Sequence, residues 1–588
     1  MEQWILHQKS ADFQEWASAL NVDPLVAKLL RNRGITDLPE ARSFLYGTAA
    51  DQHDPFLMKD MDLLTDRLLK ALQEGHRIRV MGDYDVDGVT STYILVRGLR
   101  LLGADADAVI PHRIRDGYGL NRSMTERAAE DGIQVILTCD NGIAASDAIA
   151  RAVELGVEVL VTDHHQVPYE IAEDGSRKEI LPPAAAVVDP HRKDCPYPYK
   201  EICGAMIAYK VMQAMKRKTE GLLSEDDMDE FLQFAALGTV CDVMPLMNEN
   251  RNIVRSGIES MKHTRNTGLR SLMRANALDP GKLSCYSLGF VLGPCINATG
   301  RLESAHAALE LLLETNERDA ILLAEEIKSL NDTRKELTQE GTDRGIRYVE
   351  EHHLEDRDVY VIYLPGTHES IAGIIAGKLR ERYAHPVFVL TDGAECVKGS
   401  GRSIDAYHMF EHMTEVKDLF LKFGGHALAA GLSMKREDIP ALEKALNERS
   451  GLTAEDFRNK VYIDAAMPFS YATKELAEQL QALEPVGTGN PTPLFALKGV
   501  HFLSLSRFGE GGKYLRFTVR TAESGTVSLT YFGDGERFEE TIKSRYPEAS
   551  LDALERGGCD YELSVTYEVG LNTYRGETKV QFLLRNVC

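Results

Sequence analysis

The sequence lacks the features that mark a secreted, membrane-spanning or disulfide-bonded protein. It has 9 cysteines, an odd number, and no Cys-x-x-Cys pair, which argues against a disulfide framework and a structural zinc ribbon. No apolar run approaches the ~18 residues of a membrane span. The opening MEQWILHQKS has no basic head followed by an apolar core, so it does not resemble a secretory signal. We therefore expect a cytoplasmic protein with no membrane partner.

Basic side chains are also scarce. The 67 Lys and Arg face 90 Asp and Glu, giving a net charge of −23, whereas a nucleic-acid-binding protein usually shows a basic footprint. Net charge is a sum over the whole surface, however, and acids that ligate cations reverse the local sign. We expect much of the remaining acid on outer helices such as 303–352. The 44% hydrophobic and 27% charged content excludes general disorder.

The length predicts about four domains. Apolar runs alternate with helical stretches from about residue 56 to 190, which predicts a parallel α/β sheet, and short alternating segments after 460 predict a β module. In chain order we predict a helical extension over 1–55, an α/β domain over 56–302, a long connecting helix over 303–352, a second α/β domain over 353–455 and an all-β domain over 456–588.

Three carboxylates at alternate positions directly follow a predicted strand, in GDYDVDG at 82–88. Like charges this close raise one another's pKa unless a cation neutralises them, so a metal site is the simplest explanation for Asp83, Asp85 and Asp87. The alternatives are a solvated turn and a calcium loop of the EF-hand type. A calcium loop needs a Glu at its twelfth position, and residues 90–94 supply none.

Other candidate ligands follow further strands and one helix. Asp140 ends a strand, although alone it would be interpreted as a helix N-cap; Asp163 and two histidines end the next strand, and Asp242 follows a predicted helix. Ligands collect beyond the carboxyl ends of parallel strands, so we predict one shared site from Asp85, Asp87, Asp140, His164 and Asp242. This oxygen-rich set without thiolate favours manganese or magnesium over zinc. Several carboxylates suit two ions about 3.5–4 Å apart, as in phosphoester hydrolysis.

These segments resemble a known superfamily. GDYDVDGVTST, TCDNG, VTDHH and GTVCDV are similar to the signature segments of the DHH phosphoesterases and, within them, of the RecJ family of bacterial 5′→3′ exonucleases specific for single-stranded DNA. The similarity extends from about residue 25 to the C-terminus. It implies an α/β fold class: a DHH parallel sheet and a DHH-associated (DHHA1) domain, joined by a long helix, plus a C-terminal OB-fold β-barrel.

The resemblance also implies roles for individual residues. The predicted ligands would hold two Mn²⁺ or Mg²⁺ ions, with Asp83 and Asp163 as supporting or bridging groups and His165 as a catalytic residue on the leaving-group side. Arg113, Asn297 and Arg301 match segments that approach the substrate phosphates. From the residues alone, the segment around Arg113 is also consistent with a turn, and Asn297 with a helix cap.

Two glycine-rich segments, GSGRS at 399–403 and FGGHALAAG at 423–431, predict phosphate binding in the second α/β domain. Glycines let backbone N–H groups approach an anion, and a guanidinium can fork onto phosphate oxygens. The resemblance implies that Ser400 and Arg402 seat a 5′ phosphate and that Gly425 and the catalytic His426 face the scissile region. Gly424 and Gly425 would both bind substrate.

In the β module, basic and aromatic residues interleave along 513–520. OB-folds bind single strands by stacking bases on aromatic rings beside a basic groove. We predict that Arg507, Phe508 and Tyr514 contact the strand, whereas Phe517 faces the barrel core.

The resemblance implies a metal-dependent exonuclease that degrades single-stranded DNA from a 5′ end to 5′-mononucleotides in recombination and repair, often alongside a helicase and a single-strand-binding protein. Two alternatives stay open. A DHH/DHHA1 phosphodiesterase acting on short oligonucleotides, phosphoadenosine phosphate or cyclic dinucleotides would share the ligands but need no β module. A non-catalytic replication scaffold would need no complete ligand set.

Overall fold

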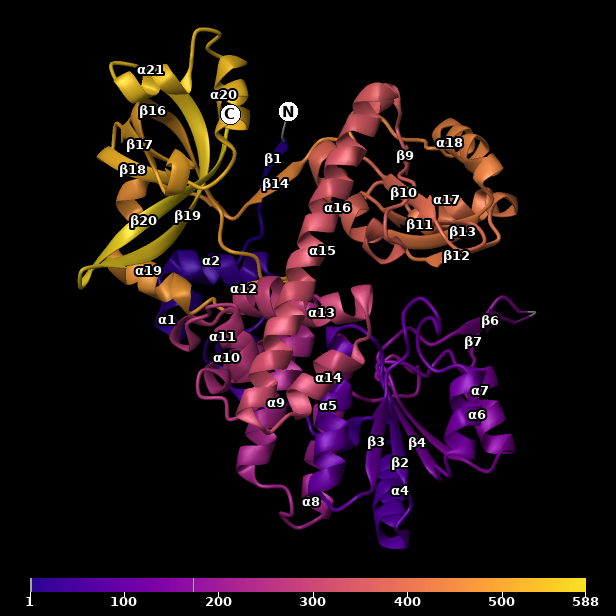
Figure 1. Cartoon of the computed structure of the whole chain (residues 1–588). Coiled ribbons are helices and arrows are strands. Elements are labelled where there is room, and N and C mark those ends of the chain that lie inside the picture. The colour runs from indigo at the N-terminus through magenta and orange to yellow at the C-terminus, as the bar shows by residue number, and fades with distance from the viewer. Residues whose placement is uncertain (1–2, 173) are drawn as a thin grey trace. The chain divides into compact units, whose positions relative to one another are not determined.

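A computed structural model describes residues 3–172 and 174–588 of the chain. Their contacts form two compact units: the first comprises His53–Met244 and Ser256–Asn459, and the second comprises residues 3–52, Pro245–Arg255 and Lys460–Cys588. Figure 1 traces the elements in chain order. Within the described residues, no helix is both long and apolar enough to cross a bilayer.

The first unit begins with a five-stranded parallel sheet in the order β3-β2-β4-β5-β8. Its strands are β2 (Ile78–Met81), β3 (Ala106–Val109), β4 (Val135–Cys139), β5 (Glu158–Thr162) and β8 (Ala186–Val188). Strands β2, β4 and β5 are almost wholly buried, as expected for a parallel sheet covered on both faces. The predicted parallel α/β sheet is confirmed.

Helices pack around this sheet, and further helices complete this part of the first unit. The helices α6 (Arg122–Glu130) and α7 (Ser146–Glu154) share one apolar cluster with the sheet, and α5 packs against α8 and α9. The other helices here are α4 (Met61–Glu74), α5 (Val86–Leu101), α8 (Gly204–Lys218), α9 (Glu225–Cys241), α11 (Thr267–Ala275), α12 (Cys285–Ser287) and α13 (Gly293–Leu302). Helix α10 (Asn248–Met261) belongs to the second unit up to Arg255 and to the first unit from Ser256. A small hairpin, β6 (Tyr169–Ile171) with β7 (Arg177–Glu179), precedes β8.

The helical stretch predicted over 303–352 is two helices, α14 (His306–Leu313) and the 35-residue α15 (Glu317–Glu351). Asn316 begins the second helix, because its side chain accepts hydrogen bonds from the amides of Arg318 and Asp319. Helix α15 packs against α11 and α13 and also against α16 (Ala372–Tyr383) of the following α/β domain (Figure 1). It therefore packs against both of the parts that it connects.

The second α/β domain has a five-stranded sheet in the order β12-β13-β11-β10-β9. Only β9 and β10 are parallel; the other pairs are antiparallel. Helix α16 packs on β10 and β11, whereas α17 and α18 contribute to an apolar cluster with alternate strand residues. The elements are β9 (Tyr360–Tyr363), β10 (Val387–Asp392), β11 (Val397–Arg402), α17 (Met409–Glu415), β12 (Lys422–Gly425), β13 (Ala429–Met434) and α18 (Ile439–Glu448).

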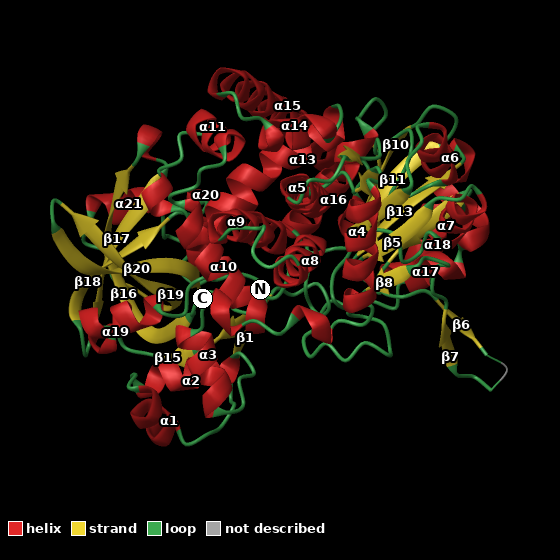
Figure 2. Cartoon of the chain, turned by 90° about the horizontal axis from the view of Figure 1, so that it is seen from below, coloured by secondary structure: helices red, strands yellow, loops and turns green. Residues whose placement is uncertain are grey.

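The second unit contains a closed β-barrel (Figure 2). Strand β16 pairs with both β17 and β19, and the ring closes through β18 and β20, which leaves no open edge. Phe517 and Val519 are fully buried, so the prediction of Phe517 as a core residue is confirmed. The elements are β14 (Lys460–Ile463), β15 (Ala465–Ala466), α19 (Lys474–Gln481), β16 (Phe495–Phe508), β17 (Tyr514–Thr521), β18 (Gly525–Tyr531), α20 (Gly535–Lys543), α21 (Leu551–Arg556), β19 (Tyr561–Tyr574) and β20 (Glu577–Val587).

The N-terminal segment is part of this second unit. Its helices α1 (Phe13–Leu20), α2 (Pro24–Asn32) and α3 (Leu38–Tyr46) share one apolar cluster with the barrel. Strand β1 (Gln3–Leu6) pairs in parallel with β14. Local periodicity predicted α2 and α3, but it carried no sign of a pairing with residues near 460.

Candidate active site

Side chains that end three parallel strands converge at one edge of the first sheet. Asp83, Asp85 and Asp87 follow β2, Asp140 follows β4, and the Asp163–His165 segment follows β5. Asp242, at the C-cap of α9, reaches the same place. The structure therefore brings together every ligand predicted from the sequence.

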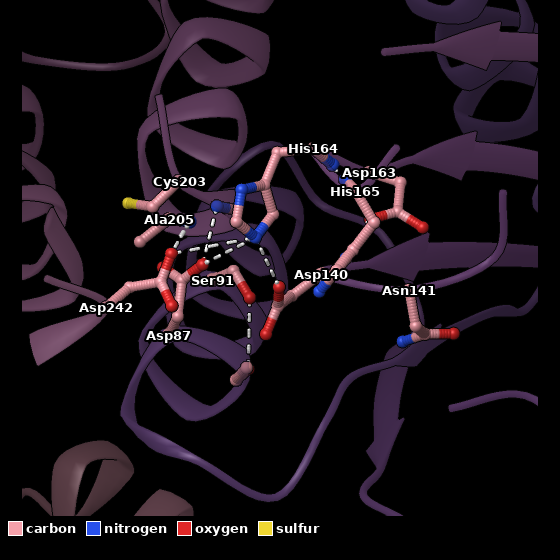
Figure 3. A network of polar contacts seen from close by, with 12 residues as sticks. Asp87, Ser91, Asp140, Asn141, Asp163, His164, His165, Cys203, Ala205 and Asp242 are labelled. Atoms are coloured by element: carbon pink, nitrogen blue, oxygen red, sulfur yellow. Dashed lines mark hydrogen bonds and ion pairs between the residues drawn. The ribbon is translucent and has the colours of Figure 1, made fainter. Parts of the chain in front are cut away.

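His164 lies at the centre of this cluster. Its Nε2 is 3.0 Å from Asp140 Oδ1, 3.6 Å from Asp87 Oδ2 and 3.8 Å from Asp242 Oδ2 (Figure 3). The imidazole is 8% exposed, so its contacts are made away from bulk water. One ring nitrogen thus faces three carboxylates from three separate elements.

Backbone amides hold the carboxylates in place. Asp85 caps α5 and accepts a hydrogen bond from Gly88 N at 3.0 Å. Asp87 accepts from Gly204 N at 2.6 Å and Ala205 N at 2.8 Å, at the start of α8. Helix N-termini and charge-assisted hydrogen bonds favour an ionised carboxylate.

Two glycines let helices approach this closely. A Cβ on Gly204 would lie 2.7 Å from Asp140 Cβ, and one on Gly238 would lie 2.7 Å from Asp87 Oδ1. Either would collide with a ligand side chain.

Two interpretations from the sequence alone are wrong. Asp140 does not cap a helix, because α7 begins only at Ser146; instead its φ of 59° turns the chain sharply after β4. Asn297 is not a helix cap either, because it lies inside α13. The N-cap signal failed at Asp140 because a turn separates strand from helix.

Four acids of the cluster resist ionisation. Burial, and then the charge of Asp85, raises the pKa of Asp83 to about 8, and burial with Asp87 raises that of Asp242 to about 8. Burial and neighbouring carboxylates also raise the pKa values of Asp85 and Asp140. A cation bound among these acids would favour their ionised form and lower their pKa values.

The donor set fits two divalent ions. Asp87, His164 and Asp242 offer ligand atoms within 4.8 Å of one another, and so do Asp83, Asp85 and Asp140; these two triads share no residue. A third group combines Asp140 and His164 with His165. Asp242 Oδ2 is buried without a hydrogen-bond partner, as expected of an oxygen that awaits a cation. Oxygen with one imidazole suits Mg²⁺ or Mn²⁺.

Asp163 orients the second histidine. Its Oδ1 accepts from the His164 amide at 2.7 Å and lies 2.7 Å from His165 Nδ1, and its Oδ2 accepts from Ile143 N at 2.9 Å. Burial alone would lower the pKa of His165, but the hydrogen bond with Asp163 raises it to about 9. The His165 imidazole is 44% exposed and protonated near neutral pH.

Tyr118 is a contact that sequence reasoning missed. Its hydroxyl donates to the Asp140 carbonyl oxygen at 2.8 Å and lies 3.1 and 3.2 Å from the two ring nitrogens of His165. It lies five residues after Arg113, in a segment for which we assigned a role only to that arginine. An aromatic hydroxyl in a segment assigned to substrate contact was the available signal.

A basic cavity of about 880 Å³ lies between the loop after β3 and the second sheet. Predicted residues Arg113, Arg301, Ser400, Arg402 and Gly424 line it, whereas among the described residues the predicted Asn297, Gly425 and His426 do not. Its six cationic side chains outnumber its three acidic ones. The cationic residues are Arg113, Arg115, Arg301, Lys398, Arg402 and Lys422.

The carboxylate cluster and the basic cavity meet at two arginines. Arg301 Nη1 donates to the Ser370 carbonyl at 2.6 Å, and Ser370 Oγ donates back to the Arg301 carbonyl at 2.8 Å. Burial, and then the charge of Arg113, lowers the pKa of Arg301 to about 10. The Arg113 guanidinium lies 4.0 Å from the centre of the Tyr84 ring, in the loop that carries the first acids.

The barrel presents three neighbouring aromatic rings. Phe508 and Tyr514 have ring centroids 5.6 Å apart, and Phe532, which sequence reasoning missed, lies 5.9 and 5.0 Å from them. The Arg516 guanidinium lies 4.9 Å from the Phe508 ring centre. The predicted Arg507 pairs with Glu555 at 3.2 Å. These half-buried and exposed rings are candidates for base stacking.

Fold and site together define the class: a DHH-type phosphoesterase with a substrate-side DHHA1 domain and an OB-type barrel. The sequence matches the models for the DHH family N-terminal domain over residues 77–239, the DHHA1 domain over 356–450 and the RecJ OB domain over 463–586. The chain belongs to the RecJ family.

Named relatives support this assignment. The chain is 34% identical to the single-stranded-DNA-specific exonuclease RecJ of Bacillus subtilis, over 97% of this chain and 68% of the relative. It is 31% identical to the enzyme of that name from Escherichia coli, over 96% of each. The fold superposes on the crystal structure of Thermus thermophilus RecJ in complex with Mn²⁺ with a TM-score of 0.82, at 28% identity, covering 100% of this chain and 79% of that chain. A Mg²⁺ complex gives a TM-score of 0.76 at 27% identity, covering 100% and 78%.

Proposed function

We propose that this chain is a metal-dependent exonuclease that degrades single-stranded DNA from its 5′ end and releases 5′-mononucleotides. One observation carries the proposal: a single compact unit holds a carboxylate–imidazole cluster directly beside a basic cavity, and Arg113 and Arg301 lie where the two meet. The relatives are named single-stranded-DNA-specific exonucleases, and two related crystal structures contain Mn²⁺ and Mg²⁺.

Two divalent ions would be held by Asp85, Asp87, Asp140, His164 and Asp242. Bound there, they would supply an activated water and stabilise the charge that develops on the phosphate. Asp83 is the third member of one ligand triad, and Asp163 acts through the histidines that it hydrogen-bonds.

The chain's own residues supply orientation and a proton. His165, held by Asp163 and protonated near neutral pH, can donate a proton to the leaving 3′ oxygen as a general acid. Arg113 and Arg301 would hold the scissile phosphate, and Ser400 and Arg402 the terminal 5′ phosphate, because guanidinium groups match phosphate geometry. We also propose that Asn297, Gly425 and His426 approach the strand, and that Arg507, Phe508 and Tyr514 contact it on the barrel.

End-labelled substrates test the activity. With Mn²⁺, the wild type should shorten a long 5′-phosphorylated single strand from its 5′ end, and Asp140→Ala should abolish degradation while binding of the strand persists. Asp147→Ala, which removes an exposed acid on α7, is the matched control and should degrade normally. Cleavage of dinucleotides alone would indicate a small-substrate phosphodiesterase. No metal-dependent cleavage of any substrate would indicate a scaffold.

A second comparison tests the 5′-phosphate pocket. Arg402→Ala should reduce the preference for a 5′-phosphate over a 5′-hydroxyl end more than it slows cleavage of either strand. Unchanged preference would remove Arg402 from the pocket. The boundaries proposed at 55, 302, 352 and 455, the helicase and single-strand-binding partners and the cytoplasmic location remain predictions.

A further inference from the structure

The basic cavity continues along β11 beyond the residues assigned to the 5′ phosphate. Side chains alternate between the two faces of a strand. Lys398, Ser400 and Arg402 therefore share the face that lines the cavity, whereas Val397 is buried in the apolar cluster behind the sheet. A second cationic residue thus lies on the same face as Arg402, four positions away.

The strand register places another lysine beside it. Lys398 on β11 is opposite Ser433 on β13, and Ser433 is opposite Lys422 on β12; all three line the cavity. Lys398 Nζ donates to Ser433 Oγ at 3.0 Å. Within the part of the chain that the structure describes, neither lysine forms an ion pair with a carboxylate. This lysine row is therefore available for an external anion.

In the next row of the sheet, glycines form the floor of the cavity. Ser400 is opposite Gly431, which is opposite Gly424. A Cβ on Gly424 or on Gly431 would meet no atom within 4 Å, and neither has a positive φ. Neither packing nor backbone conformation demands glycine there, and glycine inside a strand often marks the close approach of a ligand. The two glycines leave a shallow trough between the lysine row and Arg402.

The dimensions of the trough suit a chain of linked phosphates. Successive rows on one face are two residues apart, roughly 6.8 Å along a strand, a distance that the P–O–P–O–P chain of a triphosphate can span.

We propose that Lys398, Lys422 and Ser433 form a polyphosphate subsite, so that the enzyme accepts single strands that begin with a 5′-di- or triphosphate as well as a monophosphate. The proposal rests on the proposed function, because it takes the α-phosphate to lie at Ser400 and Arg402. The outer phosphates then lie over the glycine floor and reach the lysine row.

The chemistry needs no new reactant. Water adds to the phosphorus of the first internucleotide diester, the bond from that phosphorus to the 3′ oxygen of the terminal nucleotide breaks, and that oxygen takes a proton. The terminal nucleotide leaves as an intact nucleoside triphosphate, and the shortened strand carries a 5′ monophosphate. The first product therefore reports how the 5′ end was held.

The test compares initial rates of the first cleavage of 5′-triphosphate and 5′-monophosphate strands of one sequence with Mn²⁺. The wild type should release a nucleoside triphosphate from the first strand. In the Lys398→Ala/Lys422→Ala variant, the ratio of kcat/KM for the triphosphate strand to that for the monophosphate strand should fall about tenfold, as for two partly exposed charge contacts. Lys417→Ala/Lys435→Ala, which removes two exposed lysines of the same domain outside the cavity, should leave the ratio at its wild-type value.

Two results would overturn the proposal: an unchanged ratio in the cavity variant, which includes an equal loss on both strands, or a wild type that degrades the monophosphate strand but releases no nucleoside triphosphate from the triphosphate strand. Binding of a labelled 5′-triphosphate oligonucleotide in EDTA separates this failure from failure of the proposed function. If no strand is degraded but the cavity variant still loses about tenfold in affinity for the triphosphate end only, the subsite stands and the exonuclease assignment falls.

Discussion

The carboxylate cluster and the basic cavity are neighbours built by opposite means. In the cluster, short acidic side chains are fixed by backbone amides and packed against glycines of two helices. In the cavity, long basic side chains from two domains reach over a sheet whose floor includes glycines with open space above them. Metal ligation needs fixed distances, whereas a flexible strand is held better by adaptable cations. The contrast predicts that a substitution in the cluster abolishes activity, whereas a substitution in the cavity reduces activity by degrees.

The largest effect should come from Asp87→Asn. The amide keeps the size of the side chain but loses the charge that two helix-start amides hold in place. Its NH₂ group is a donor, so one of these two backbone amides loses its acceptor. Activity with Mn²⁺ should fall more than about 100-fold, beyond the loss typical of changing a residue that only hydrogen-bonds a metal ligand. Initial rates on a 5′-phosphorylated strand measure this.

Asp147→Asn, which removes a carboxylate charge outside the cluster, is the control and should retain the wild-type rate. A loss under tenfold in Asp87→Asn, with Mn²⁺ affinity preserved, would show that Asp87 is not a ligand and that the cluster tolerates change as the cavity does.

A smaller effect is expected for Arg301→Ala. The half-buried guanidinium donates to the Ser370 carbonyl and faces Arg113, so its loss removes a charged phosphate contact worth about 1.5–3 kcal/mol. KM for the strand should rise roughly 10- to 100-fold, with a smaller change in kcat. Arg301→Lys should raise KM by an intermediate amount, since the charge remains but the two-pronged contact of the guanidinium is lost.

Arg274→Ala, an exposed arginine on α11, should leave KM unchanged. If Arg301→Ala lowers kcat as far as Asp87→Asn does, the division into a rigid catalytic cluster and an adaptable binding cavity is wrong.

Local sequence predicted the cluster better than the cavity. The acids sit in contiguous segments after strands, and parallel topology then brings strand ends together, so Asp85, Asp140 and His164 could be assigned to one site. Lys398 and Lys422 escaped prediction because only the β11–β13–β12 register places them in one row. Tyr118 escaped because its contact with His165 joins residues 47 positions apart. The long strand β16 and the packing of α1–α3 on the barrel depend in the same way on tertiary contacts.

The pH dependence of stability should separate the two regions without any substrate. Asp83 and Asp242 have pKa values of about 8 in the folded, metal-free protein, against about 3.9 for an unperturbed Asp. Between these values the folded state holds protons that the unfolded chain has released, so the free energy of unfolding should decrease as pH rises from about 5 to 8. In EDTA, Tm should fall by at least a few degrees over this range.

Saturating Mn²⁺ should raise Tm and remove this decline, because a bound cation stabilises the ionised acids and stabilises the folded state by mass action. Asp242→Asn should flatten the EDTA profile, whereas Arg402→Ala in the cavity should not. An EDTA profile that rises between pH 5 and 8 would contradict the proton retention assigned to the cluster.

The smallest effect should come from Tyr118→Phe, at the border between the two regions. The Tyr118 hydroxyl donates to the Asp140 carbonyl and lies beside both ring nitrogens of His165. The Tyr118 ring packs edge-on near Tyr84, and the Arg113 guanidinium lies over the face of the Tyr84 ring. A single neutral hydrogen bond contributes about 0.5–1.5 kcal/mol, so kcat should fall roughly two- to tenfold while KM stays constant.

Losing an acceptor beside the imidazolium should lower the pKa of His165. Since protonated His165 is the proposed acid, the alkaline fall in kcat should begin at lower pH than in the wild type. A slower variant with an unshifted pH profile would make Tyr118 a packing residue, and a raised KM would place it in the cavity.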